Sequence, residues 1–118
     1  MNLAELFHHA TGRQLLPAGQ TLFKEGESGD LMYILMTGTA DIIVHDRVME
    51  SAGPGTLLGE MAMIDAAPRS ATVLATSECT FLPISRDRFN FLVQQTPNFA
   101  LHVMRKMADR LRATDAIL

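Results

Sequence analysis

The chain is poor in the residues and segments that mark secreted, membrane-spanning and nucleic-acid-binding proteins. Cys79 is the single cysteine among 118 residues, so no internal disulfide bond can form, and a reducing cytoplasm fits this composition. No apolar run approaches the ~18 residues that a membrane-spanning helix requires, and the longest run, Leu31–Met36, has the length of a strand. The formal net charge of −3 argues against a general affinity for nucleic acids.

The start of the chain has no basic segment followed by an apolar one, so we expect no signal peptide. Met1 is followed directly by a predicted capped helix, which suggests a natural start. The hydrophobic content of 47% is sufficient for a folded core, and 118 residues is a usual length for one domain. We therefore expect a single domain over residues 1–118 and a cytoplasmic location.

Between Arg13 and Ser85, short apolar runs alternate with turn residues at intervals of roughly 8–12 residues. This pattern is typical of an all-β sandwich or barrel. The strands that can be delimited from the pattern are Arg13–Leu16, Thr21–Lys24, Leu31–Thr37, Thr39–His45, Val48–Ser51, Ser70–Ala75 and Thr80–Ser85.

The pattern at the N-terminus is helical. Asn2 is placed to cap a short helix over Asn2–Ala10, with Glu5 as its reciprocal partner. The apolar stripe of this helix consists of Leu3, Leu6 and Phe7.

Two further helices are expected after the strands. Ser85 can cap a helix over Arg86–Gln95, and Thr96 can cap a last helix in which Pro97 takes the first position. The apolar face of the first consists of Phe89, Leu92 and Val93. On the last helix, which runs to about the chain end, a heptad seam consists of Ala100, Met104, Met107, Leu111, Thr114 and Leu118. The seam is shorter than a coiled coil normally requires, so it either packs on the protein's own barrel or joins two copies in a dimer.

The stretch Leu58–Thr72, L-G-E-M-A-M-I-D-A-A-P-R-S-A-T, combines groups suited to a phosphate ester that carries a sugar. Gly59 allows a sharp backbone turn and a close approach by a ligand. Glu60–Asp65 can form one or two helical turns, whose first N–H groups are free to bind an anion. Arg69 offers a planar fork of donors to a pair of anionic oxygens, and the Glu60 carboxylate is an acceptor for ribose hydroxyls.

This stretch resembles the phosphate-binding cassette of the cyclic nucleotide-binding domain family. The family's cassette reads apolar–Gly–Glu–x–small–apolar, then a short spacer, then Arg–Ser/Thr/Ala–Ala–x–apolar. The matching positions are Leu58, Gly59, Glu60, Ala62, Met63, Arg69, Ser70, Ala71 and Val73. So many fixed positions at the right spacing make a specific signal.

A second stretch, Leu22–Gly38, is similar to another pattern of the same family: an apolar pair, Gly–acidic–x–Gly, an apolar run and a final glycine. Phe23 is bulkier than the usual residue at its place. The glycines are turn residues, so this stretch supports the fold rather than the chemistry. The resemblance implies a mainly β fold: an eight-stranded jelly-roll β-barrel with a short N-terminal helix, a short helix in the cassette and two C-terminal helices.

The resemblance also implies binding of a cyclic nucleotide, without catalysis, a cofactor or a metal. Arg69 pairs with the cyclic phosphate, and Glu60 accepts the ribose 2′-hydroxyl. Backbone amides near Gly59, Glu60 and Ala71, with the hydroxyls of Ser70 and Thr72, complete the shell. The last helix covers the base. The candidate ligand-binding residues are Gly59, Glu60, Met61, Ala62, Arg69, Ser70, Ala71, Thr72, Arg110, Thr114 and Asp115.

The identity of the base and the effector are less well specified by the sequence. A threonine after the arginine tends to favour cyclic GMP in this family, so Ser70 leads us to favour cyclic AMP. Ligand binding is expected to draw the cassette and the last two helices inward. The effector is either an unidentified partner protein or part of a longer channel, kinase or transcription regulator. No residues follow Leu118 to build a helix-turn-helix, so we do not expect this chain alone to bind DNA.

The sequence offers little support for three other functions. A cupin-type enzyme holds its metal with a close His-x-His pair and a third histidine, whereas His8, His9, His45 and His102 are not so spaced. No Ser, His and acid form a recognisable nucleophile elbow. An interaction module that has kept the fold and lost the ligand is the remaining alternative, and the intact Glu60 and Arg69 argue against it.

Overall fold

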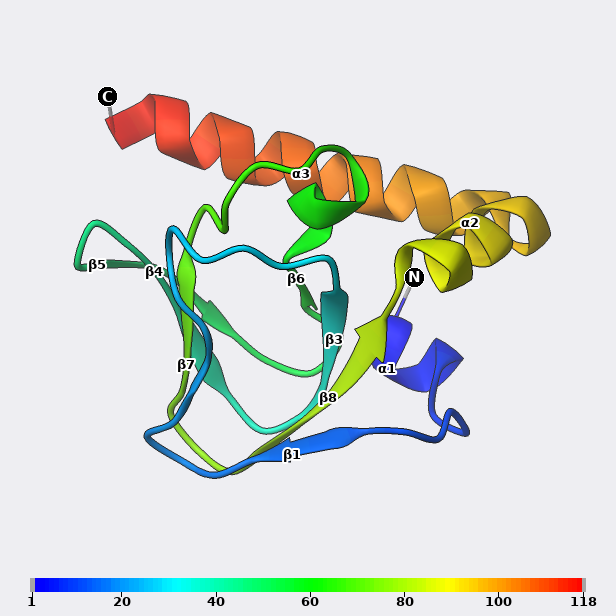
Figure 1. Ribbon diagram of the computed structural model, residues 1–118, viewed down its shortest axis with the longest axis horizontal. Helices are drawn as coiled ribbons and strands as arrows, with labels where there is room; N and C mark the ends of the chain where they lie inside the picture. The colour runs from blue at the N-terminus through cyan, green and yellow to red at the C-terminus, as the bar shows by residue number, and fades with distance from the viewer. Residues whose placement is uncertain (1, 118) are drawn as a thin grey trace.

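Two antiparallel sheets form the body of the molecule (Figure 1), and the computed structural model describes the backbone of residues 2–117 and the side chains of residues 2–112. The strands in this range are β1 (Gln14–Leu16), β2 (Thr21–Phe23), β3 (Met32–Thr37), β4 (Ala40–Val44), β5 (Arg47–Ala52), β6 (Leu57–Leu58), β7 (Thr72–Ala75) and β8 (Cys79–Ile84). One sheet has the order β1-β8-β3-β6 and the other β2-β7-β4-β5. The arrangement confirms the predicted jelly-roll fold.

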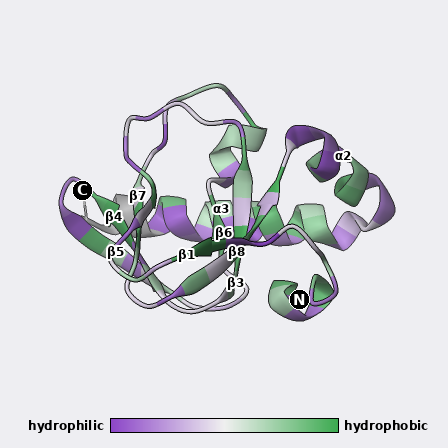
Figure 2. Cartoon of the chain, turned by 60° about the horizontal axis from the view of Figure 1, so that its bottom comes forward, coloured by the Kyte–Doolittle hydropathy of each residue, from purple (hydrophilic) through white to green (hydrophobic). Residues whose placement is uncertain are grey.

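The helices are α1 (Leu3–Leu6), the 3-10 helix η1 (Glu60–Met63), α2 (Arg86–Gln95) and α3 (Pro97–Ile117). Figure 1 shows α3 running along one edge of the strands, with α2 beside its N-terminal part. In Figure 2, α2 is coloured mostly as hydrophilic, whereas α3 has alternating hydrophilic and hydrophobic bands. Within residues 2–117, no helix is both long and apolar enough to span a lipid bilayer.

The central strand β3 is buried on both faces, which explains its uninterrupted apolar sequence. Its even-numbered residues, with Ile34 at the centre, join a core that also contains α1 and the two C-terminal helices. Its odd-numbered residues Tyr33 and Leu35 point the other way, into a core shared by the two sheets. The first half of the cassette therefore contacts both cores, because Leu58 belongs to the second core and Met63 to the first.

The strand prediction delimited seven of the eight strands and missed β6. This strand has only two residues, which pair with β3 as Tyr33↔Leu58 and Ile34↔Leu57, and two residues show no periodicity. The range Ser70–Ala75 was two residues too long, because β7 begins at Thr72. Arg69, just before it, instead pairs through its backbone with the β2–β3 turn.

Asn2 caps α1 as predicted, since its Oδ1 accepts hydrogen bonds from Ala4 N at 3.1 Å and Glu5 N at 3.3 Å. The helix is shorter than the predicted range Asn2–Ala10. It ends at Leu6 because the next turn is closed by a tighter bond from His8 N to Glu5 O. Leu6 was wrongly placed on the apolar stripe, and its side chain is 49% exposed.

Both C-terminal helices have the predicted starts, and the predicted face of α2 packs on the core. The seam on α3 is divided: Met107 packs against the protein's own first core, whereas Met104 is 56% and Leu111 63% exposed. The buried face of α3 also contains Phe99 and Val103, and Phe99 packs edge-on against Phe7, with ring centroids 6.1 Å apart. The dimer interpretation stays a prediction, and the side chains of Thr114 and Leu118 lie outside the described residues.

Candidate functional site

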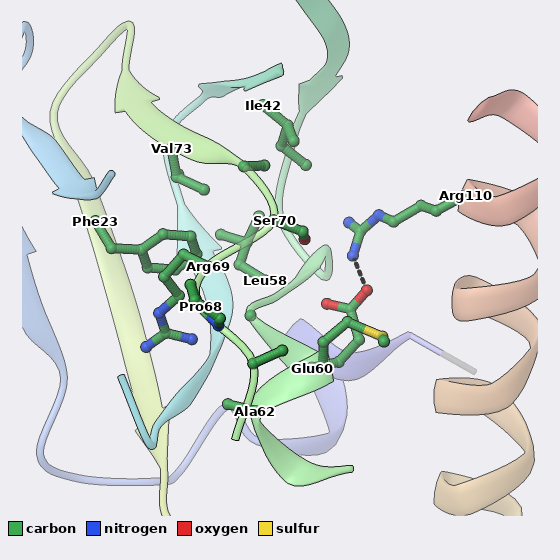
Figure 3. A pocket seen from close by; sticks show the side chains of 14 residues that line it. Phe23, Ile42, Leu58, Glu60, Ala62, Pro68, Arg69, Ser70, Val73 and Arg110 are labelled. Atoms are coloured by element: carbon green, nitrogen blue, oxygen red, sulfur yellow. Dashed lines mark hydrogen bonds and ion pairs between the residues drawn. The ribbon is translucent and has the colours of Figure 1, made fainter. Parts of the chain in front are cut away.

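A pocket lies between the cassette, strands β2 and β4, and α3 (Figure 3). Its cavity of about 60 Å³ has room for a few water molecules. Eight of the eleven predicted site residues line it: Gly59, Glu60, Met61, Ala62, Arg69, Ser70, Ala71 and Arg110. The fold thus brings the two halves of the cassette together with one side chain from α3.

Gly59 begins η1 in a left-handed conformation, with φ of 71°, which favours glycine over other residues. A Cβ atom here would overlap Nη1 of Arg69 and approach the carbonyl oxygen of Leu31 to 3.2 Å. A larger residue at position 59 would therefore strain the backbone and displace the arginine.

The end of η1 is fastened to α2. Arg86, the first residue of α2, donates hydrogen bonds from Nη1 to Met63 O at 3.0 Å and from Nη2 to Ala62 O at 2.9 Å. These carbonyls end a short helix and have no partner within it. The Arg86 side chain therefore connects the end of η1 to the start of α2.

Glu60 is buried, with 4% exposure, and faces α3. Its Oε1 accepts a hydrogen bond from Arg110 Nη1 at 2.5 Å, the dashed line of Figure 3. Its Oε2 is buried and has no hydrogen-bond partner among the described residues. The Glu60 carboxylate therefore has one oxygen paired and one available to a hydroxyl donor.

Arg110 connects α3 to two strands. Its Nε donates to Glu50 Oε2 on β5 at 3.2 Å, and its Nη2 donates to Leu57 O on β6 at 2.6 Å. Burial by itself would lower the pKa of Arg110, but the carboxylates of Glu60 and Glu50 raise it above its usual value. The guanidinium consequently keeps its charge at the edge of the pocket.

Arg69 is 9% exposed, and its backbone is held on both sides. Gly26 N donates to Arg69 O, and Arg69 N donates to Glu27 O, each at 2.8 Å. The guanidinium carbon lies 4.2 Å from the centroid of the Phe23 ring, and Figure 3 shows the side chain beside that ring. Within the described part of the chain, Nε and Nη1 are buried without a hydrogen-bond partner.

The pocket therefore presents unpaired polar atoms of both kinds: two donors on Arg69 and one acceptor on Glu60. Leaving such buried atoms unpaired is unfavourable by roughly 1–3 kcal/mol each, and more for charged groups. Native proteins pair most such atoms, so the arrangement fits a ligand that carries an anionic group and a hydroxyl.

The remaining predicted residues are placed differently. Ser70 is exposed at the pocket, and Met61 is 43% exposed. Thr72 lies outside the pocket lining, and its hydroxyl accepts a hydrogen bond from Glu25 N at 2.9 Å. Thr114 and Asp115 belong to α3, but their side chains lie outside the described residues.

Six residues that line the pocket were not predicted as ligand-binding residues: Phe23, Ile42, Leu58, Ala67, Pro68 and Val73. The sequence shows Phe23 only as a residue bulkier than the family pattern has at this place. That unusual size was the one feature of the sequence that could have indicated its role at the site. Glu50 shares Arg110 with Glu60, although 60 residues separate it from Arg110 in the sequence. Nothing local in the sequence indicates that pairing. Among the side chains of residues 2–112, no group of three or more His, Cys, Asp and Glu converges as a metal site.

Comparisons with known proteins show similarity in both sequence and fold. The family model of the cyclic nucleotide-binding domain matches residues 13–96. The cyclic AMP receptor protein of Thermus thermophilus is 31% identical over 108 residues, which cover 87% of this chain and 50% of that protein. A cyclic nucleotide-gated potassium channel of Rhizobium etli is 33% identical over 97 residues, which cover 82% of this chain and 27% of the channel.

Among solved structures, one described by the words "A cyclic-GMP-dependent signalling pathway regulates bacterial phytopathogenesis" superposes with a TM-score of 0.77 at 30% identity and covers 94% of each chain. The chain spans half or less of the length of the two curated relatives above.

Proposed function

The chain belongs to the cyclic nucleotide-binding domain family, and on that basis we propose that it is a receptor module that binds a cyclic nucleotide in the pocket between the cassette and α3. The observation that carries the proposal is that one pocket is lined both by Arg69, with two unpaired donors, and by Glu60, with one unpaired acceptor. The cyclic phosphate supplies acceptor oxygens to Arg69. The ribose 2′-hydroxyl donates its proton to Oε2 of Glu60.

Cyclic AMP is the proposed ligand in preference to cyclic GMP. Ser70 after the arginine supports this choice through the family pattern, and the Thermus relative is named a cyclic AMP receptor protein. The solved structure with the cyclic-GMP description covers nearly all of this chain, so both nucleotides belong in the test.

The proposed signal is a movement of α3. The cavity has room for only a few water molecules, and the proposed binding step widens it. Arg110 already holds Oε1 of Glu60, and the ribose hydroxyl would bind the neighbouring Oε2 of the same carboxylate. Ligand binding would therefore redistribute the contacts that hold α3, while Arg86 would couple η1 to α2. A ligand shifts this equilibrium only by its differential affinity for the two states.

The module is proposed to act in the cytoplasm, either on a partner protein or as the sensor part of a longer chain. A homodimer through α3 is part of this proposal, because Met104 and Leu111 of the predicted seam are exposed. Sedimentation velocity of the wild-type chain and of Met104→Glu tests it. A dimer that becomes a monomer on substitution would support the seam, and a wild-type monomer at high concentration would contradict it.

The function is tested by isothermal titration calorimetry with cyclic AMP, cyclic GMP, 5′-AMP and 2′-deoxy cyclic AMP. A few charge-assisted hydrogen bonds of roughly 1.5–3 kcal/mol each, reduced by the entropy of association, give an affinity around micromolar, or about −8 kcal/mol. We expect the tightest binding for cyclic AMP, weaker binding for the deoxy analogue and no binding for 5′-AMP. A folded protein that binds neither cyclic nucleotide would refute the proposal and favour the interaction-module alternative.

A further inference from the structure

The guanidinium carbon of Arg69 lies over the aromatic ring of Phe23, 4.2 Å from the ring centroid. We propose that Phe23 is the positioning residue of the phosphate site: it holds Arg69 by the face of the guanidinium and leaves the in-plane N–H groups for the ligand. The inference rests on the proposed function, because it assumes that Arg69 binds the cyclic phosphate.

Arg69 sits in a slot that has the Phe23 ring on one side and two glycines around its edge. A Cβ atom on Gly29 would overlap Nη2 and Nε of Arg69, and one on Gly59 would overlap Nη1. The absence of side chains at positions 29 and 59 therefore admits the guanidinium. The Phe23 ring then sets its orientation, because it is the aromatic surface against which the cation lies.

Phe23 is itself held firmly. Its side chain is 9% exposed and belongs to the core between the two sheets. Its ring centroid lies 6.1 Å from that of Tyr33, which in turn lies 6.3 Å from that of Phe81. Closely packed cores confine side chains to single arrangements, so the ring offers a fixed surface to the arginine.

The direction of the cation–π attraction determines which N–H donors of Arg69 remain available to the ligand. A cation over an aromatic face is attracted by the ring quadrupole, which acts perpendicular to the ring plane. A carboxylate would instead take two in-plane N–H groups and would compete with a phosphate for them. Among residues 2–112, no carboxylate lies within ion-pair distance of Arg69, and its Nε and Nη1 stay unpaired. The ring thus orients the cation without using its N–H donors.

The contact with Arg69 accounts for the large aromatic residue at position 23, where the family pattern has a smaller one. A smaller aliphatic residue would fill part of the core but would offer no quadrupole to the cation. Arg69 would then sample other rotamers, and ordering it would reduce the observed affinity, since fixing a long side chain costs conformational entropy.

The test compares Phe23→Leu, which removes the ring, with Phe23→Tyr, which keeps it. Phe99→Leu is the control, because Phe99 is fully buried but belongs to the other core and does not line the pocket. Calorimetric titration with cyclic AMP should show an affinity about tenfold lower for Phe23→Leu and within about threefold of wild type for Phe23→Tyr and Phe99→Leu. Equal losses in Phe23→Leu and Phe99→Leu would overturn the proposal, since they would show a general effect of core damage.

A second measurement does not need the ligand. In NMR spectra of the free protein, the Nε–H proton of Arg69, assigned by its absence in Arg69→Lys, should lie upfield through the ring current of Phe23. It should move downfield in Phe23→Leu and stay upfield in Phe23→Tyr. An unchanged shift in Phe23→Leu would overturn the contact. If the wild-type protein bound no cyclic nucleotide, the proposed function would fail, while this shift would still decide whether Phe23 positions Arg69. Phe23→Met replaces Phe23→Leu if the latter does not fold.

Discussion

The contact between Arg110 and Glu60 is predicted to support the fold as well as the site. Replacing Arg110 by alanine leaves the Glu60 carboxylate, whose side chain is 6% exposed, with neither oxygen paired by a cation. Removing one partner of a buried ion pair typically destabilises a protein by roughly 3–5 kcal/mol. The Arg110 side chain is 28% exposed, so solvent replaces part of the lost interaction.

The contact with Glu50 adds little, because the Glu50 side chain is 40% exposed, and such pairs contribute about 0–1 kcal/mol. We therefore expect Arg110→Ala to lower the free energy of unfolding by about 2–4 kcal/mol. For a domain of this size the Tm would fall by roughly 10 °C. Urea denaturation followed by circular dichroism measures the free energy, and a thermal scan measures the Tm.

The matched control is Arg112→Ala, on the same helix. Its side chain is 76% exposed and pairs with Asp109 at 3.3 Å, so its loss should change stability by less than about 0.5 kcal/mol. A double-mutant cycle with Glu60→Gln isolates the pair, and we expect a coupling of about 1 kcal/mol or more. Additive effects of the two substitutions, or equal stability of Arg110→Ala and Arg112→Ala, would refute the reasoning.

Two further outcomes are expected. Gly59→Ala should destabilise the domain by about 1–2 kcal/mol through its left-handed backbone and weaken cyclic nucleotide binding by displacing Arg69. Gly53→Ala is the control, because a Cβ at position 53 would meet nothing within 4 Å. It should change neither the Tm in a thermal scan nor the affinity for a cyclic nucleotide in a calorimetric titration. Equal effects of Gly59→Ala and Gly53→Ala would contradict the account. Burial, followed by the charge of Lys106, lowers the pKa of His102, so the unfolded state takes up this proton first as the pH falls below about 6.5. The free energy of unfolding should therefore be lower at pH 5 than at pH 7. In urea titrations at the two pH values, His102→Gln should make this difference smaller. An unchanged difference would contradict the assignment to His102.

The cassette could be predicted from the sequence because its parts interact over a short distance along the chain. Gly59 and Glu60 are neighbours, and both are placed by the same turn. Arg69 follows a few residues later, after a spacer that leads into β7. The spacing of Gly59, Glu60 and Arg69 was therefore sufficient to predict that they lie close together, and the structure places all three residues at one pocket.

The orientation of α3 could not be predicted in this way. A heptad pattern shows which residues share a face but not which body that face contacts. The buried face of α3 is determined by Phe99, which packs against Phe7 near the N-terminus and Phe89 on α2. The contact between Phe23 and Arg69 likewise joins β2 to the cassette and depends on the folded sheets.

Binding of cyclic AMP to Arg69→Ala, compared with wild type by isothermal titration calorimetry, tests the central claim most directly. The substitution removes two donors that the account assigns to the cyclic phosphate. At roughly 1.5–3 kcal/mol for each charge-assisted hydrogen bond, the affinity should fall at least about 100-fold, while circular dichroism shows a folded domain. A folded Arg69→Ala protein that binds cyclic AMP within about threefold of wild type would contradict the account.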